Sequence, residues 1–459
     1  MHNTIELDTI VALATVPGQS AIHVIRLSGP DAIKIVNKVF KGKDLETQAG
    51  HTAHFGTIRQ EDGTIVDEVL ATIFYGPRSY TGENTVEISC HGSQFIADQL
   101  LQLFMQVGAR YAKAGEFTQR AFANGKLDLA QAEAVADLIA ADSHASRDAA
   151  MQQMRGGFSN DIKKLREKLI HFASMIELEL DFSEEDVEFA SRDDLKALIN
   201  ELKRVIKALI DSFSLGNVLK NGVPTVIAGK PNAGKSTLLN ALLNEDKAIV
   251  SEVAGTTRDF IEDEINIGGI TFRFVDTAGL RETQDRVEAI GVQRSYEKMK
   301  QASLIMYMFD ASESSFAEVQ NEVEALDKLG VPYILVANKL DKLATGLAED
   351  FKVFSENLIE ISADKGTGVE ELKERALHLV NLDKVQTGNT MVTNARHYQS
   401  LRETMKALDD VINGIDMGMT GDFLAIDIRS SLHHLGEITG EVTTDDLLEN
   451  IFSKFCIGK

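Results

Sequence analysis

The chain has 459 residues, 44% of them hydrophobic and 25% charged, which is ordinary for a globular protein long enough for about three domains. Its formal net charge of −23 excludes a generally basic nucleic-acid binder, so any contact with RNA needs a local patch. No stretch approaches about 20 uncharged apolar residues, and the N-terminus is acidic where a signal peptide is basic. Two cysteines, Cys90 and Cys456, are too few for a disulfide framework. We therefore expect a cytoplasmic protein with reduced thiols and no membrane span.

Residues 1–124 predict a small α/β domain. Apolar segments at 20–29, 68–77 and 84–92 are typical of strands, and 93–108 is typical of a helix. Two segments rich in glycine and polar residues, "SYTGENTVEISCHGS" and "KAGEFTQRAFANGKLD", are consistent either with turns and helix caps or with a ligand pocket. The charged residues that would line such a pocket are Glu83, Glu87, His91, Arg120 and Lys126.

A helical block follows. Residues 128–215 repeat apolar positions at intervals of three and four behind a predicted cap at Asp128, and residues 394–413 and 421–455 resume this pattern. The simplest architecture is one helical domain, residues 125–218 and 381–459, interrupted by an inserted domain at 219–380. The acidic run "DFSEEDVEF" lacks the pattern of a metal-binding loop, so a solvated helix end is the better interpretation.

The insertion begins with a phosphate-binding motif. An apolar run at 226–228 leads into "GKPNAGKS" (229–236) and then a predicted helix, which is the context that G-x-x-x-x-G-K-[ST] requires. The backbone N–H groups of this loop and the helix N-terminus present positive partial charge to phosphates. Lys235 is predicted to reach the β- and γ-phosphates, and the Ser236 hydroxyl to bind Mg2+.

The remaining nucleotide elements follow in order. "GTTRD" (255–259) is typical of a switch loop with a magnesium-binding threonine, and "FRFVDTAG" leads a strand into Asp276 and Gly279. "YILVANKLD" ends at Asp341, whose carboxylate accepts the paired N–H and NH2 of guanine, and "LIEISADKG" supplies a loop that closes over the base. Five elements in this order predict GTP rather than ATP. Leu280 replaces the water-orienting glutamine of small signalling GTPases, and the residues left as alternatives are Arg281, Glu282, Asp285, Arg286 and Glu288.

The whole order resembles the MnmE (TrmE) family of tRNA-modification GTPases, in the TrmE-Era-EngA class. The resemblance rests on "DTIVALAT", "SYTGENTVEISCHG", "GEFTQRAFANGKLDLAQAEAVADLI", "GKPNAGKSTLLNAL", "GTTRD", "DTAGLRET" and the terminal "FCIGK". It implies an N-terminal folate-binding and homodimerisation domain, a helical domain and an inserted GTPase domain with a mainly parallel sheet. It further implies that the chain works with MnmG, an FAD protein, on tRNA. Together they would add a carboxymethylaminomethyl or aminomethyl group to C5 of the wobble uridine, with a one-carbon unit from 5-formyltetrahydrofolate or a related tetrahydrofolate.

The resemblance also assigns residues. It implies folate contacts at Arg26, Glu87, Lys126 and Lys459, and it selects Glu288 for hydrolysis. It implies K+ ligands at Asn232, Ser251, Val253 and Thr256, where K+ replaces an arginine finger and two GTPase domains enclose it, and Mg2+ ligands at Ser236 and Thr257. The complete set of expected GTP contacts is Asn232, Ala233, Gly234, Lys235, Ser236, Thr237, Ser251, Glu252, Val253, Ala254, Gly255, Thr256, Thr257, Asp276, Thr277, Ala278, Gly279, Asn338, Lys339, Asp341, Ser362, Ala363 and Asp364. The chain departs from the family in having serine at 251, where threonine is frequent, and in "ATVPGQS", which lacks the usual glycine-rich run.

The tail "SKFCIGK" raises a separate question, since Cys456 lies four positions from the end. Gly458 and Lys459 break a prenylation box and no polybasic segment precedes it, so the pattern argues against lipid attachment. A cap at Thr443 predicts a packed helix that ends near Cys456. The apolar stripe of that helix is Leu447, Leu448, Ile451, Phe452 and Phe455. A catalytic role for the Cys456 thiol remains a hypothesis.

Two other functions compete with this one. A GTPase of ribosome assembly, of the Era or EngA kind, would need a basic RNA-binding domain that the composition does not indicate. A folate-binding scaffold with a vestigial GTPase is disfavoured because the key nucleotide residues, Lys235, Ser236, Asp276 and Asp341, are intact.

Overall fold

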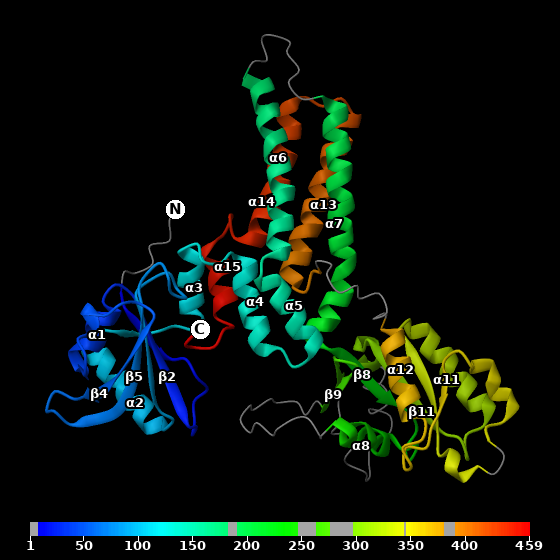
Figure 1. The fold of residues 1–459 in the computed structure, drawn as a ribbon. Helices are drawn as coiled ribbons and strands as arrows, with labels where there is room; N and C mark the ends of the chain where they lie inside the picture. Colours follow the sequence, from blue (N-terminus) through cyan, green and yellow to red (C-terminus); the bar gives the residue numbers. More distant parts are fainter. Residues whose placement is uncertain (1–7, 182–190, 247–262, 276–296, 344–345, 381–390) are drawn as a thin grey trace. The chain divides into compact units, whose positions relative to one another are not determined.

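The computed structural model describes residues 8–181, 191–246, 263–275, 297–343, 346–380 and 391–459. The chain forms two compact units (Figure 1), and each is described by itself. The first comprises Met1–Ile139, Gln152–Arg204 and Ser400–Lys459, and the second comprises Ala140–Met151 and Val205–Gln399. The fold is multidomain, with α/β and all-helical parts, as the sequence predicted.

The first unit contains a seven-stranded sheet in the order β3-β4-β5-β6-β2-β1-β7. Neighbouring strands are antiparallel except β1 and β7, which run parallel. The strands are β1 (Ile10–Leu13), β2 (Ile22–Ser28), β3 (Phe40–Lys41), β4 (Thr52–Arg59), β5 (Ile65–Phe74), β6 (Thr85–His91) and β7 (Arg110–Tyr111). The three strands predicted in this domain correspond to β2, β5 and β6, so those predictions are confirmed.

One face of this sheet is covered by helices. Helices α1 (Ala32–Val39) and α2 (Gln94–Gln106) share a core with alternate strand residues such as Val86 and Ile88 of β6. Leu100 and Phe104 of α2 are fully buried in this core, and each contributes about 1.5–3 kcal/mol to stability. The intervening residues of β6, Glu87 and Ser89, therefore point to the other face of the sheet.

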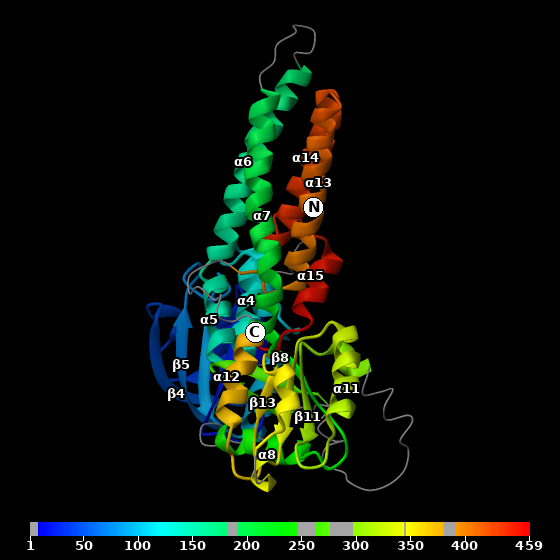
Figure 2. The same cartoon turned by 90° about the vertical axis from the view of Figure 1, so that its right-hand side faces the viewer.

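The helical part of the first unit is built from long antiparallel helices. Its elements are α3 (Glu116–Ala123), α4 (Leu129–Ala140), α6 (Gly157–Asp181), α14 (Gly421–Thr439) and α15 (Asp445–Phe452), together with the larger part of α13 (Ala395–Asp416), from Ser400, and the part of α7 (Arg192–Asn221) up to Arg204. Figures 1 and 2 show α6, α7, α13 and α14 side by side. In α6 the buried residues Ile162, Leu165, Leu169, Ala173 and Ile176 confirm the predicted spacing of three and four. None of the described helices is both long and apolar enough to cross a membrane.

The second unit contains a six-stranded sheet in the order β13-β12-β11-β8-β10-β9, parallel except for β9. Its strands are β8 (Val223–Ala228), β9 (Asp263–Ile267), β10 (Ile270–Phe274), β11 (Leu304–Asp310), β12 (Tyr333–Asn338) and β13 (Leu358–Glu360). Its helices are α5 (His144–Met154), α8 (Lys235–Asp246), α11 (Phe316–Leu329) and α12 (Val369–Leu379), with 3-10 turns η2 (Leu340–Lys342) and η3 (Glu349–Phe354). Both faces are covered, because Met306 and Met308 of β11 join one apolar core and Ile305 and Phe309 join the other.

Two further contacts organise this unit. Ala145 of α5 donates its backbone N–H to Gly269, in the turn between β9 and β10, at 3.3 Å. Asp142 accepts a hydrogen bond from Thr271 at 3.0 Å, so the start of α5 is fastened to the β9–β10 hairpin.

The segments that lead into and out of the sheet lie next to each other, because Phe213 of α7 stacks on Tyr398 of α13 at 4.4 Å. This proximity is consistent with an insertion at 219–380, whose limits stay a prediction.

The C-terminal helices differ from the sequence prediction at one helix break and one cap. Residues 421–455 are divided by Gly440, which ends α14 in a left-handed conformation at φ 84°. The cap of α15 is Thr444 rather than the predicted Thr443, because the Thr444 side chain accepts the N–H of Leu447. The predicted apolar stripe is confirmed, since Leu448 and Phe452 are buried beside Leu129.

Candidate functional sites

The phosphate loop follows the carboxyl end of β8 and leads into α8. Lys235 folds back over this loop and donates to the carbonyls of Gly229 at 2.7 Å and Lys230 at 2.8 Å, and burial lowers its pKa. Glycine is required at two positions. A Cβ at Gly229 would lie 2.0 Å from the carbonyl oxygen of Met308, and a Cβ at Gly234 would lie 2.2 Å from the Asn338 amide.

The predicted base-binding residues gather at the carboxyl ends of β12 and β13. The buried Asn338 donates to the carbonyl of Ala233 at 2.8 Å and accepts the N–H of Ala363 at 3.0 Å, so it joins the phosphate loop to the loop after β13. Asp341 accepts from the Ser362 hydroxyl at 2.6 Å, and this hydrogen bond lowers its pKa. An ionised, oriented carboxylate at this position is what recognition of guanine requires.

A second interaction supports this arrangement. Lys339, with left-handed backbone at φ 68°, pairs with Asp310 at 2.6 Å across β11 and β12. Ser236 and Thr237 lie in the first turn of α8, and Asp364 is exposed beside Ala363. The expected contacts at Ser251–Thr257 and Asp276–Gly279, and the hydrolytic Glu288, lie outside the described residues.

A second candidate site lies on the N-terminal sheet. Arg26 of β2 and Glu87 of β6 are opposite each other in the strand register, and their side chains pair at 2.9 Å. The guanidinium of Arg26 also lies over the rings of Tyr80, at 5.2 Å, and Phe117, at 5.7 Å. These cation–π contacts hold the Arg26 group in place beside a carboxylate whose second oxygen has no hydrogen-bond partner among the described residues.

The C-terminal tail reaches this pair. Ile457 forms a bridge with Ala114, and Arg26 donates to the carbonyl of Gly458 at 3.4 Å. Gly458 has φ +98°, and a Cβ there would lie 2.1 Å from the carbonyl oxygen of Leu13 at the end of β1. Residues 432 positions apart, Arg26 and Gly458, are thus brought together.

Other predicted members of this site are placed differently. Lys126 is exposed and donates to the carbonyl of Pro77 at 3.0 Å, and no described contact links its side chain or that of Lys459 to the Arg26–Glu87 pair. Cys456 is exposed beside the tail contact, whereas burial raises the pKa of Cys90 to about 11.

The pocket interpretation fails for Glu83 and Arg120. Arg120 is only 1% exposed and pairs with Asp8 at 2.6 Å, Glu83 at 3.2 Å and Glu116 at 3.1 Å, so its role is structural. Burial alone would raise the pKa of Glu116, but hydrogen bonds from Arg110, the Lys113 backbone and Arg120 outweigh it and lower the pKa. His91 is likewise occupied, because it pairs with Asp67 at 2.7 Å. Asp8, the first residue of "DTIVALAT", was not predicted as a partner of Arg120, because that stretch gives no local indication of which distant side chain it meets.

The parallel sheet, the lysine of the phosphate loop and the Asn338–Asp341 pair define a GTP-binding P-loop protein. Family models extend this class: that for the MnmE helical domain matches residues 129–456, and that for the GTP-binding protein TrmE N-terminus matches residues 9–126. The chain therefore belongs to the MnmE (TrmE) family of tRNA modification GTPases.

Individual relatives agree with this assignment. The chain is 62% identical over 452 residues to the tRNA modification GTPase MnmE of Cytophaga hutchinsonii, covering 98% of each chain. It is 54% identical to the protein of that name from Christiangramia forsetii, covering 98% of this chain and 99% of the other. The G-domain of FeoB from Methanococcus jannaschii is 27% identical and covers 35% of this chain and 98% of its own, with a TM-score of 0.27, which is too low to support an argument.

Proposed function

We propose that this chain is a potassium-activated, cytoplasmic GTP hydrolase that works with MnmG on certain tRNAs. The pair would add a carboxymethylaminomethyl or aminomethyl group to C5 of the wobble uridine, using a one-carbon unit from a tetrahydrofolate. The proposal rests on one observation: this member of the family has both a phosphate loop with Lys235 and an Arg26–Glu87 ion pair that the C-terminal tail contacts.

For GTP hydrolysis, the described residues support binding and orientation. Lys235 would exchange its two loop carbonyls for phosphate oxygens, and Asp341 would accept the guanine N–H and NH2. Oxygen-bearing side chains suit both cations. Ser236, with Thr257, would hold Mg2+, and Asn232 would contribute to a K+ site with residues of the 251–256 segment. The bound cations would offset negative charge that develops at the β–γ bridge.

Replacing K+ with Na+ at equal ionic strength tests the first half of the proposal. We expect the turnover of GTP to fall by at least about tenfold, which corresponds to a loss of about 1.4 kcal/mol of transition-state stabilisation. Binding of GDP should change little, because Lys235 and Asp341 do not depend on the ion. Equal turnover in the two salts would contradict the proposal.

For the folate, the chemistry of the Arg26–Glu87 pair is suitable. A pterin presents the same N–H and NH2 edge as guanine, and the free oxygen of Glu87 is able to accept it. Arg26, Lys126 and Lys459 would meet carboxylates or the formyl oxygen through charge-assisted hydrogen bonds. Glu87→Gln should weaken tetrahydrofolate binding by at least about tenfold in calorimetry, with GTP hydrolysis unchanged.

The face of the N-terminal sheet opposite helices α1 and α2 supports a homodimer. The strand register places Phe55, Leu70, Ser89 and Val24 in one row across four strands, and Phe55 and Leu70 are 68% and 41% exposed. Two large apolar side chains, Phe55 and Leu70, exposed opposite each other on neighbouring strands favour a protein interface. Arg26 and Glu87 lie in the adjacent row of the same face, so a partner subunit docked there would stand beside the folate pair.

Nucleoside analysis of tRNA tests the second half of the proposal. Cells that lack this chain should contain wobble uridines without the aminomethyl-type group, and the wild-type gene should restore it. Cells that express Cys456→Ser should lose the modification while the purified variant keeps its GTP turnover. Full modification by that variant would leave Cys456 without a chemical role, and normal wobble uridines in the deletion strain would refute the function itself.

A further inference from the structure

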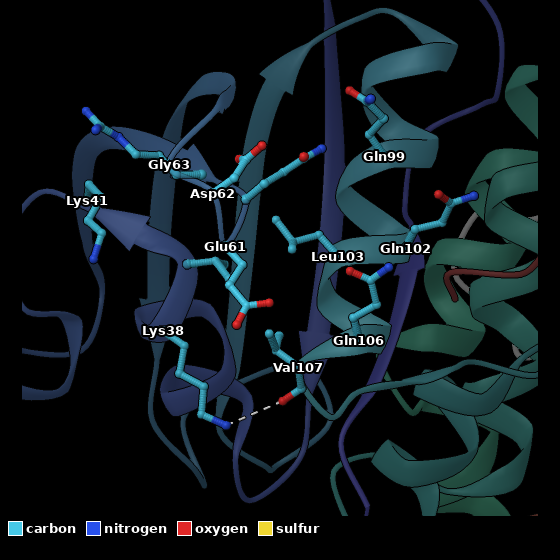
Figure 3. Close-up of a pocket in the computed structure, with 13 residues that line it drawn as sticks. Lys38, Lys41, Glu61, Asp62, Gly63, Gln99, Gln102, Leu103, Gln106 and Val107 are labelled. Atoms are coloured by element: carbon cyan, nitrogen blue, oxygen red, sulfur yellow. Dashed lines mark hydrogen bonds between the residues drawn. The ribbon is translucent and has the colours of Figure 1, made fainter.

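We propose that a polar cavity in the N-terminal domain binds the phosphodiester backbone of tRNA. The cavity has a volume of about 930 Å3 and lies between the carboxyl ends of α1 and α2, strand β3 and the turn from β4 to β5. Figure 3 shows Gln99, Gln102 and Gln106 along α2 on one side and Lys41 on the other. The inference rests on the proposed function, in which tRNA is the substrate, and it adds a contact site that is separate from the Arg26–Glu87 pair.

The cations of this cavity are available to a ligand. Lys38, Lys41 and Arg59 line it, and none of them pairs with a carboxylate in the described part of the chain. The ammonium of Lys38 is directed by a hydrogen bond to the carbonyl of Val107 at 3.5 Å, which leaves further N–H donors for a ligand. Arg59 is steadied by its hydrogen bond to Thr57 at 3.2 Å. Three cations that line one hollow without a carboxylate partner in the described part of the chain suit phosphate oxygens.

The amides add a second kind of contact. Gln99, Gln102 and Gln106 follow each other at intervals of three and four on α2, so they share one face of the helix. Within the part of the chain that the structure describes, none of these side chains makes a hydrogen bond to the protein. An amide supplies both donors and an acceptor, which match ribose hydroxyls and base edges. A peptide partner is less well matched, since most of the lining residues are polar or charged.

Two acidic groups partly offset the positive charge of the cavity. Glu61 and Asp62 also line it, so three cations and two carboxylates give a local charge of +1. The Asp62 carboxylate accepts the N–H of Thr64 at 2.8 Å within its own turn, and this bond lowers its pKa. Glu61 makes no such bond and opposes an incoming phosphate. The cavity is therefore a local patch of the kind that an acidic RNA-binding protein needs.

The test measures tRNA affinity of the full-length protein across a salt series, by fluorescence anisotropy of labelled tRNA. A triple variant (Lys38→Gln, Lys41→Gln, Arg59→Gln) should bind tRNA at least about tenfold more weakly at low salt. The slope of log K against log salt should become shallower by about two to three, close to one for each lost phosphate contact. The variant should hydrolyse GTP at the wild-type rate with the same preference for K+.

A matched control removes three exposed cations elsewhere (Arg78→Gln, Lys300→Gln, Lys328→Gln) and gives the same net charge. Its tRNA affinity should stay within about twofold of wild type, so a general charge effect is distinguished from loss of the cavity. Glu61→Gln acts in the opposite direction and should strengthen binding a few-fold, a gain that misfolding does not produce.

Three results would overturn the inference. They are an unchanged affinity and salt slope in the triple variant, an equal loss in the control, and no tRNA binding by the wild-type chain. Titration with uridine monophosphate separates a free nucleotide from RNA, and saturable binding of it in the cavity without any tRNA effect would also count against the proposal. Two separate measurements test the proposed function itself. Equal GTP turnover in K+ and Na+, or normal wobble uridines in the deletion strain, would contradict that function whatever the triple variant does.

Discussion

Substitution of Gly458 by alanine should release the tail from the N-terminal sheet without unfolding the protein. The left-handed backbone at φ +98° costs an L-residue about 1–2 kcal/mol, and the new Cβ would lie 2.1 Å from the Leu13 carbonyl oxygen. This oxygen belongs to the last residue of strand β1, where Leu13 pairs with Ile25 of β2, so it is a backbone atom of the sheet and not the end of a flexible side chain.

The contacts that hold the tail are too weak to offset this strain. Its contacts here are two hydrogen bonds of 3.4 Å, from Arg26 to the carbonyl of Gly458 and from Gly115 to the carbonyl of Cys456, each worth about 0.5–1.5 kcal/mol. Ile457 is 49% exposed and adds little burial. A net loss of about 2 kcal/mol opens the tail roughly 30-fold more often.

Hydrogen exchange of residues 454–459 measures this opening directly. The control is Gly63→Ala, because Gly63 has φ +88° but a Cβ there meets nothing within 4 Å. Both variants should melt near the wild-type temperature, and only Gly458→Ala should exchange its tail amides faster and bind tetrahydrofolate more weakly. Wild-type protection of the tail in Gly458→Ala would refute the steric reasoning.

Three other predictions concern the rest of the molecule. A thiol reagent at pH 8 should modify one cysteine per native chain and two after denaturation, because burial raises the pKa of Cys90 to about 11 while Cys456 is exposed; modification of both in the native state would contradict this. The folded pKa of Glu116 is lowered from 4.5, so its stabilisation is complete above that pH and is lost as the pH falls through the folded value. Glu116→Gln should therefore lower the free energy of unfolding, measured with urea at pH 7, by about 1–3 kcal/mol. The difference between variant and wild type should shrink below pH 4.5, and an equal difference at every pH would count against this prediction. A double-mutant cycle of Asp142→Ala with Thr271→Val should give a coupling of about 0.5–1.5 kcal/mol, whereas additive effects would show that α5 is not held to the hairpin by this bond.

The secondary structure was predicted most accurately around the phosphate loop, where an apolar run and a phosphate-binding motif indicate the same elements. The strand before Gly229 and the helix after Lys235 follow from an apolar run and a motif that only that context permits, and the structure has both. Strands β1 and β4 were not predicted. A four-residue apolar run such as Ile10–Leu13 has no period to read, and Thr52–Arg59 has no regular apolar alternation, because its buried positions are Gly56 and Ile58 while Phe55 is exposed.

The residues that only tertiary structure brings together were harder to assign. Arg120 lies in a polar segment and resembled a ligand contact, but it is buried among the carboxylates of Asp8 and Glu83, from two distant segments, and of Glu116 in its own helix. Capping was predicted one residue early because Thr443 and Thr444 are chemically equivalent in the sequence and only the position of the Leu447 N–H distinguishes them. The approach of Gly458 to Arg26 spans almost the whole chain, and no local pattern encodes it.

The bridge between Ala114 and Ile457 also has a consequence for synthesis on the ribosome. Translation adds about 5–20 residues per second, so the 343 positions from Ala114 to Ile457 (457 − 114) take roughly 17–70 s. The seven strands of the N-terminal sheet all precede residue 112, so the sheet is able to fold during that interval, whereas the tail contact forms only once Ile457 and Gly458 have been synthesised. A chain that terminates before Gly458 therefore keeps the strands of its sheet but lacks the Gly458 carbonyl at Arg26, and its second site is incomplete.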